Sequence, residues 1–190
     1  MKTYLIPSLK ITLLTIILFG VIYPFAITGI AKVIAPNKGE GSVIEANGSV
    51  VGFEVIGQSF VSDKYFNSRP SAVAYNAAAT GGSNKGPTNP EYLAVVEERI
   101  TNFLKQNPDV KREEVTVDMV TASGGGLDPH ISPRAAEIQI ERISKIRNIT
   151  KEKLQELVHD YTEQPLLGLL GTPKVNLLKL NMALDNLKIN

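Results

Sequence analysis

An uncharged, strongly apolar run near the N-terminus limits what this chain can fold into. The run extends from Ile11 to Ala31, and Lys10 and Lys32 flank it. As a helix it would be roughly 32 Å long, close to the roughly 30 Å thickness of the hydrocarbon core of a bilayer. A helix satisfies its own backbone hydrogen bonds, which lipid cannot do for it. We therefore predict one membrane-spanning helix within an anchor that covers residues 1–35.

Two alternatives compete with a retained membrane anchor. A cleaved signal peptide has a shorter apolar core, of about 7–15 residues, and a small-x-small cleavage site. Only Gly29-Ile30-Ala31 comes near such a site here, and no cysteine is available for lipidation. A buried core helix would need a large soluble shell around it. Because Pro24 removes a backbone donor and kinks a helix, we also expect this span to pack against other helices.

The distribution of basic residues gives a small preference for one orientation. Lys2, Lys10 and the α-amino group precede the span, whereas Lys32 and Lys38 follow it. The positive-inside rule counts Lys and Arg near the span, so it slightly favours a cytoplasmic N-terminus. The short N-terminal flank and the long C-terminal part are typical of a signal-anchor protein. We predict a single-pass protein of the plasma membrane, or of the inner membrane in a Gram-negative cell, with its main domain outside the cytoplasm.

The remaining residues suffice for one ordinary domain, and their composition excludes some classes of function. The absence of cysteine rules out disulfides and thiolate metal sites. From residue 36 onward the chain carries 17 basic and 19 acidic residues. Such a balance argues against a nucleic-acid-binding protein, which would present a basic face. The two histidines, His130 and His159, are too few for a typical metal site.

The local patterns predict an α+β fold, with one extramembrane domain at residues 49–190 after a glycine-rich linker at residues 36–48. Asn89 and Ser132 are expected N-caps, each followed by a proline in the first turn of a helix. We expect a small sheet with helices packed on it. The predicted segments are a strand at 49–56, a short strand or turn at 60–70, a helix at 90–106, a strand at 115–121, helices from 133 and at 151–161, and a strand running into a short helix at 174–187.

Two stretches, 71–90 and 121–133, are so rich in small residues that they cannot form regular elements, and side-chain hydrogen bonds must hold their backbone. Residues 81–88 have the glycine spacing of a phosphate-binding P-loop, but Pro87 stands where the lysine belongs. Side chains such as Gln58, Asn76, Asn84 and Gln139 are expected to brace loops through hydrogen bonds.

Ser123, Asp128 and His130 also suggest a hydrolase. Thr121 replaces the first glycine of the G-x-S-x-G pattern, so we favour a turn that leads to the Ser132 cap. A membrane-anchored extracytoplasmic serine hydrolase and a free-standing anchored binding domain stay as alternatives.

Several short motifs occur in an order that resembles one family, the C subunit of the Kdp potassium-transporting P-type ATPase. The resemblance covers nearly the whole chain, and its most specific motif is the stretch from Val120 to Ser132. Thr80 and Gly125 depart from it, since serine is usual at both positions. The matching pieces are Gly57-Gln58-Ser59-Phe60, Tyr65-Phe66, Arg69-Pro70-Ser71-Ala72, Tyr75-Asn76, Gly81-Gly82-Ser83-Asn84, Gly86-Pro87, the stretch 120–132, Ala135-Ala136, Gln139, Arg142, Val175-Asn176-Leu177 and Leu180-Asn181.

The resemblance implies a non-catalytic accessory subunit of a high-affinity potassium uptake complex. Its expected partners are a channel-like potassium-binding subunit and a P-type subunit that hydrolyses ATP. The complex would use ATP and potassium, whereas this subunit would hold no cofactor of its own. In that family the C subunit is needed for assembly and activity, and it resembles a catalytic chaperone that raises the affinity of the P-type subunit for ATP. An extracytoplasmic domain would instead cover or brace the potassium entrance.

Two patches are the candidate interface or nucleotide-related sites, because glycines permit close backbone approach. No catalytic and no metal-binding residue is predicted. The first patch consists of Asn76, Gly81, Gly82, Ser83 and Asn84, and the second of Thr121, Ser123, Gly124, Asp128 and His130.

Overall fold

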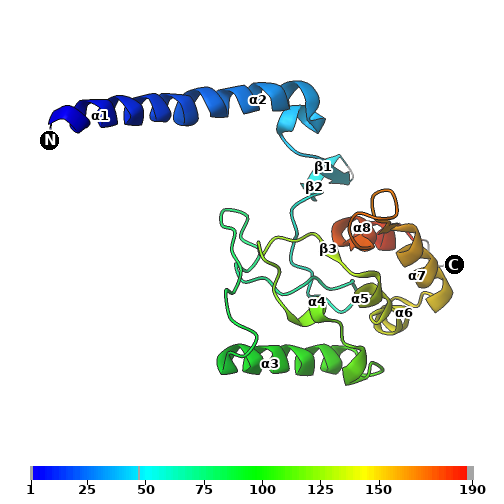
Figure 1. Cartoon of the computed structure of the whole chain (residues 1–190). Coiled ribbons are helices and arrows are strands. Elements are labelled where there is room, and N and C mark those ends of the chain that lie inside the picture. Colours follow the sequence, from blue (N-terminus) through cyan, green and yellow to red (C-terminus); the bar gives the residue numbers. More distant parts are fainter. Residues whose placement is uncertain (1, 47, 188–190) are drawn as a thin grey trace. The chain divides into compact units, whose positions relative to one another are not determined.

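The computed structural model describes residues 2–46 and 48–187 of the chain. These residues form two compact units, one that ends at Ser42 and one that begins at Val43 (Figure 1). Each unit is described by itself.

The first unit is one long helix followed by a short turn. The helix consists of α1 (Lys2–Ile17), the π-helical turn η1 (Leu18–Ile22) and α2 (Tyr23–Ile34). The 3₁₀ turn η2 (Pro36–Gly39) follows it. Among the described residues, Tyr4–Ile34 is the one helix long and apolar enough to cross a membrane, and it contains the predicted span at 11–31.

A π turn accommodates Pro24 in the middle of this helix. The N–H of Tyr23 donates to the carbonyl of Leu18, five residues earlier. Pro24 has no N–H to donate, and its ring would crowd the preceding carbonyls of a regular α-helix. The wider turn gives this crowded region a different hydrogen-bonding pattern, and the ribbon continues through it (Figure 1).

The second unit begins with a two-stranded antiparallel hairpin. Strand β1 (Val43–Ala46) pairs with β2 (Ser49–Phe53), with Val43 opposite Phe53 and a register shift between Ile44 and Glu45. Strand β1 lies inside the range 36–48 predicted as a linker, because the two β-branched residues at its start find a partner strand. The predicted strand at 49–56 ends at Phe53.

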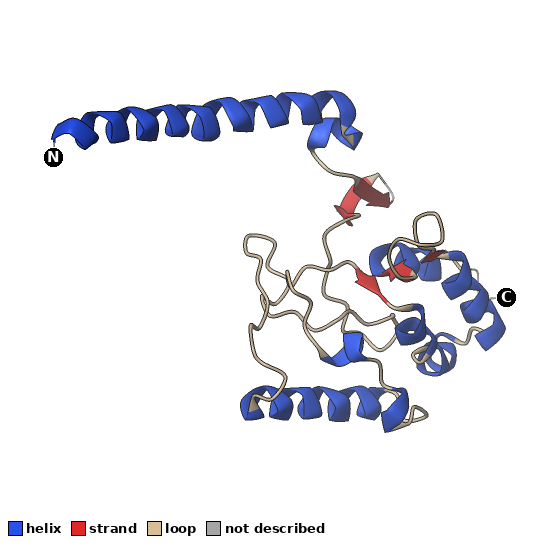
Figure 2. Ribbon diagram, in the orientation of Figure 1, coloured by secondary structure: helices blue, strands red, loops and turns tan. Residues whose placement is uncertain are grey.

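The rest of this unit combines a small antiparallel sheet with helices, which confirms the predicted α+β class (Figure 2). In the sheet, β5 (Lys174–Asn176) lies between β3 (His130–Ile131) and β4 (Thr162–Glu163). Asn89 and Ser132 cap helices as predicted, accepting from the N–H groups of Tyr92 and Ala135. The helices are α3 (Pro90–Gln106), the 3₁₀ turn η3 (Arg112–Glu114), α4 (Val117–Val120), α5 (Pro133–Glu137), α6 (Ile140–Arg147), α7 (Lys151–Asp160) and α8 (Leu177–Asn186).

The predicted strand at 115–121 is wrong, because Val117–Val120 form a helical turn, α4. This turn buries Met119 and Val120. It also brings the carboxylate of Asp118 to the backbone N–H of Ser132, at 2.7 Å. One turn of helix therefore supplies both apolar burial and a hydrogen bond to the start of α5, and no neighbouring strand is needed.

The core is built from side chains of the helices α3 to α8 and of the strands β3 and β5. Phe66, from the irregular segment 57–72, is completely buried in the same cluster. Segment 57–72 forms no helix or strand. Of the two alternatives predicted for 60–70, a short strand or a turn, the strand is therefore wrong. The fully buried aliphatic side chains are Ala135, Ala136, Ile143, Leu154, Val175, Leu180 and Leu184.

Candidate functional site

The fold brings the two stretches of small residues side by side. The N–H of Gly81 donates to the carbonyl of Gly125 at 3.0 Å. A Cβ atom placed on Gly82 would lie 3.0 Å from the carbonyl oxygen of Gly124. The hydroxyl of Ser71 donates to the carbonyl of Gly126 at 2.6 Å. Segments that are more than 40 residues apart in sequence therefore form one surface, which we call the glycine surface (residues 81–86 with 124–125).

The glycines around this surface fall into two groups. Gly126 has φ +73°, and a Cβ there would lie 2.6 Å from the side chain of Val73. A Cβ on Gly57 would lie 2.4 Å from the carbonyl oxygen of Asp128. These two positions require glycine for the fold itself. In contrast, a Cβ on Gly124 or Gly125 would meet nothing within 4 Å, and both residues are exposed.

The other residues of the first predicted patch are exposed loop residues. Asn76 braces its own turn, because its side-chain oxygen accepts from the N–H of Ala78 at 3.0 Å. Asn84 adopts the left-handed conformation, with φ 51°, which asparagine tolerates better than most residues. Ser83 lies next to it and is also exposed. This part of the patch presents small polar groups to its surroundings.

The second predicted patch is more buried than the first. The hydroxyl of Thr121 donates to the carbonyl of Val117, so it stabilises the end of α4. Ser123 is only 7 % exposed. In the described part of the chain no hydrogen bond joins Ser123 to His130, the pair that a hydrolase would need. The hydrolase alternative stays a hypothesis that no contact here favours.

Asp128 is the centre of the polar contacts in this patch. Its carboxylate accepts from a guanidinium nitrogen of Arg69 at 2.6 Å and from the backbone N–H of His130 at 3.0 Å. The imidazole Nδ1 of His130 lies 3.5 Å from the same carboxylate. Burial raises the pKa of Asp128, but the hydrogen bonds from His130 and the charge of Arg69 outweigh it, so its pKa is below the ordinary value.

Arg69 was not predicted as a site residue, and neither were Tyr75 and Ser71, which position it. The hydroxyl of Tyr75 donates to the carbonyl of Arg69 at 2.7 Å, and the hydroxyl of Ser71 accepts from the N–H of Tyr75. The only signal was that all three residues belong to matching family motifs. No local pattern pairs Arg69 with Asp128, because 59 residues separate them.

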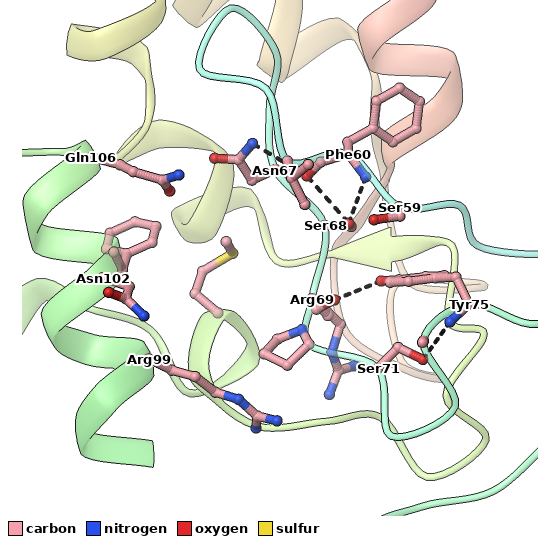
Figure 3. A pocket seen from close by; sticks show the side chains of 15 residues that line it. Ser59, Phe60, Asn67, Ser68, Arg69, Ser71, Tyr75, Arg99, Asn102 and Gln106 are labelled. Carbon is pink, nitrogen blue, oxygen red and sulfur yellow. Dashed lines mark hydrogen bonds between the residues drawn. The ribbon is translucent and has the colours of Figure 1, made fainter. Parts of the chain in front are cut away.

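A cavity of about 410 Å³ lies between α3 and the irregular segment (Figure 3). Arg99 extends from α3 toward the segment that carries Arg69, and it donates to the carbonyl of Val120 at 3.0 Å. The polar lining of the cavity also includes Asn102 and Gln106. Within residues 2–46 and 48–187, no group of three or more His, Cys, Asp or Glu side chains could hold a metal ion.

A buried polar network holds the irregular segment on the helices. Arg142 of α6 is 5 % exposed, and its guanidinium donates to the side chains of Asn107, Asn67 and Gln139 at 2.7–3.0 Å. It also donates to the carbonyls of Asp63 and Tyr65. Burial lowers the pKa of Arg142 to about 10.

Amide side chains complete this network. The oxygen of Gln139 accepts from the N–H of Asn67 at 2.7 Å, which confirms Gln139 as a brace. Asn181 of α8 bonds to both the N–H and the carbonyl of Phe66, each at 2.9 Å. No local pattern assigns this function to Asn67 and Asn181, since the bonds depend on tertiary contact.

Comparisons with known proteins give a consistent result. The family model KdpC, described as K+-transporting ATPase, c chain, matches residues 5–186. A potassium-transporting ATPase KdpC subunit from Flavobacterium psychrophilum is 53 % identical over 180 residues, covering 95 % of this chain and 96 % of the relative. KdpC subunits from Bacteroides fragilis (48 % identical, 99 % of each chain) and Bacillus cereus (45 % identical, 98 % and 97 %) are similar to it as well.

Proposed function

The chain belongs to the KdpC family of K+-transporting ATPase c chains, and from that membership we propose that it is a non-catalytic accessory subunit that braces the potassium entrance of the transport complex. Its partners are then a channel-like potassium-binding subunit and a P-type subunit that hydrolyses ATP. The complex uses ATP and potassium, and this subunit holds no cofactor of its own.

The observation that carries the proposal is the glycine surface. Gly124 and Gly125 are exposed and have free space where a side chain would be, so a partner backbone can approach them closely. The loops beneath them are fixed by backbone hydrogen bonds, including Gly81 to Gly125. A preformed surface loses less conformational entropy on binding than a flexible loop.

The side of the membrane decides between bracing and a direct action on ATP. A chaperone that raises the affinity of the P-type subunit for ATP by touching the nucleotide must place its domain in the cytoplasm. We place the domain outside, because the basic residues before the span favour a cytoplasmic N-terminus. The bracing function follows from that orientation.

Labelling of a single introduced cysteine tests the orientation. The chain contains no cysteine, and Ser83 is exposed, so Ser83→Cys gives one accessible thiol. Intact cells, permeabilised at the outer membrane if they have one, are treated with a membrane-impermeant maleimide. We expect labelling before the inner membrane is lysed. Labelling only after lysis would overturn the bracing proposal and favour nucleotide contact through residues 81–86.

A graded series at Gly124 tests the interface. Because the position is open, Gly124→Ala, Gly124→Val and Gly124→Leu should leave the free energy of unfolding nearly unchanged. We expect co-purification with the partner subunits and potassium uptake to decrease as the side chain grows, by about tenfold for Leu. Unchanged assembly and uptake across the whole series would remove the glycine surface from the interface.

A further inference from the structure

The loop between β4 and β5 exposes four leucines at its tip. Leu166, Leu167, Leu169 and Leu170 are 67 %, 83 %, 84 % and 64 % exposed. The loop is the orange one that stands out near α8 in Figure 1. Contiguous exposed apolar groups of this kind usually mark a surface that contacts a protein or a membrane. We call residues 165–171 the leucine loop.

Backbone hydrogen bonds within the leucine loop hold it in a tight turn. Leu166 and Leu170 exchange two bonds, each donating to the carbonyl of the other at 3.1 and 3.0 Å. The N–H of Gly168 donates to Pro165, and that of Leu169 donates to Leu166, at 2.9 and 3.2 Å. Backbone groups that enter lipid must be paired within the protein, since no water is available there. Four of the six N–H groups of the loop but only three of its seven carbonyls are paired with other groups of the loop, so its tip suits the interfacial region, where water remains, and not the hydrocarbon core.

The polarity of the loop changes sharply at its base. No residue from Pro165 to Gly171 has a polar side chain. At the base, Lys174 and Glu163 form an exposed ion pair at 3.4 Å. Charged groups at this position keep the base in water, so they limit how deeply the tip can enter an apolar phase.

The anchor keeps the leucine loop near a membrane. Eight residues, Ala35–Ser42, join the long helix to the second unit, and they span at most about 29 Å when extended. Glu54, directly after the hairpin that follows, contacts the strand at the base of the loop, because its carbonyl accepts from the side chain of Asn176 of β5 at 2.8 Å. The second unit, which carries the leucine loop, is therefore tethered to the membrane helix by a short linker.

We propose that the leucine loop inserts into the interfacial region of the membrane that the chain's own helix crosses. Lipid fits it better than a protein groove because its contact groups are aliphatic only. Cores of protein interfaces are enriched in aromatic residues and arginine, and none occurs in this loop. Fluid acyl chains also conform to a tip whose leucines are exposed on both sides of a tight turn. The inference depends on the anchor and not on the bracing function.

Depth-dependent quenching of a fluorescent label tests this insertion. The full chain with Leu169→Cys is labelled with the environment-sensitive dye NBD and reconstituted, without other subunits, in phosphatidylcholine–phosphatidylglycerol vesicles. The matched control carries the label at Val117, an aliphatic residue of α4 that is 72 % exposed. We expect lipids with a doxyl group near the glycerol end of the acyl chain to quench the Leu169 label at least threefold more than the Val117 label.

A second variant separates insertion by the leucines from insertion by the dye. With the label moved to Leu166→Cys, the double change Leu167→Ser and Leu169→Ser should reduce quenching to the level of the control. Both leucines are exposed, so the midpoint of unfolding should not change. Equal quenching at Leu169 and Val117 would overturn the proposal. Shielding of Leu169 that appears only when the partner subunits are reconstituted would also overturn it and assign the loop to a protein contact.

Discussion

Two irregular regions of the second unit are held in different ways. Segment 57–72 is fixed by side chains, mainly Arg142, Gln139 and Asn181, which bond to its buried backbone. The glycine surface is fixed by backbone groups that approach each other directly, as in the bond from Gly81 to Gly125. The first arrangement fails when a buried polar group loses its partner, and the second fails when a side chain is added. A segment without regular secondary structure can therefore have a conformation as well defined as that of a sheet.

The largest expected effect is at the centre of the buried network. Arg142→Met should lower the free energy of unfolding by about 3–5 kcal/mol, because it leaves several buried oxygens unpaired. Unfolding of the full chain in detergent micelles, followed by tyrosine near-UV circular dichroism, measures the loss. The matched control is Arg134→Met, since Arg134 is 54 % exposed and its ion pairs with Glu114 and Glu137 are on the surface. A similar loss in both variants would contradict the special position of Arg142.

Asn181 tests a single brace of the same segment. Asn181→Leu keeps the branched shape of the side chain but removes both bonds to Phe66, so we expect a loss of about 2–3 kcal/mol. Asn186→Leu, at an exposed position in the last turn of the same helix, should change stability by less than about 0.5 kcal/mol. If the Asn181 variant unfolds like the wild type, the segment is held by apolar packing of Phe66 alone.

Gly126, beside the glycine surface, and Gly124, on it, should respond in opposite ways to an added methyl group. Gly126→Ala should cost about 2 kcal/mol, because it combines a left-handed φ with a Cβ 2.6 Å from Val73. Gly124→Ala adds the same methyl group in open space, and its unfolding should match the wild type. Chemical denaturation of both variants measures their free energies of unfolding. Equal stability of the two would mean that the loops are not packed as described.

The smallest effect concerns acid stability through Asp128. Since its pKa is lowered in the folded state, the carboxylate stabilises the fold fully above about pH 4 and loses this contribution as the pH falls through the folded pKa. Asp128→Asn should therefore flatten the pH dependence of unfolding below about pH 4. Glu152→Gln, an exposed change on α7, is the control. A steep acid limb in the Asn variant equal to that of the wild type would contradict the contact with Arg69.

The sequence predicted those features that depend on nearby residues. The membrane span, the Asn89 and Ser132 caps and the α+β class all follow from local periodicity and turn chemistry. The strand predicted at 115–121 failed because tertiary burial of Met119 and Val120 outweighed a weak alternation.

The site could be predicted only in part. Small residues marked both stretches, but their meeting depends on the fold, as does the pairing of Arg69 with Asp128. The network around Arg142 gave no local signal, since its partners are up to 79 residues away.

The π turn in the long helix has a consequence for any helix that packs beside it. A turn with one extra residue rotates everything after it by about 100° relative to an uninterrupted α-helix. Ala26 and Gly29 lie one turn apart after Tyr23 and share a face. A helical wheel drawn without the extra residue would align that face with the wrong residues of α1. Residues that share a face in α1 are therefore not continued on the same face in α2. A neighbouring helix that packs along one face of α1 must contact a different set of positions after Leu18–Ile22.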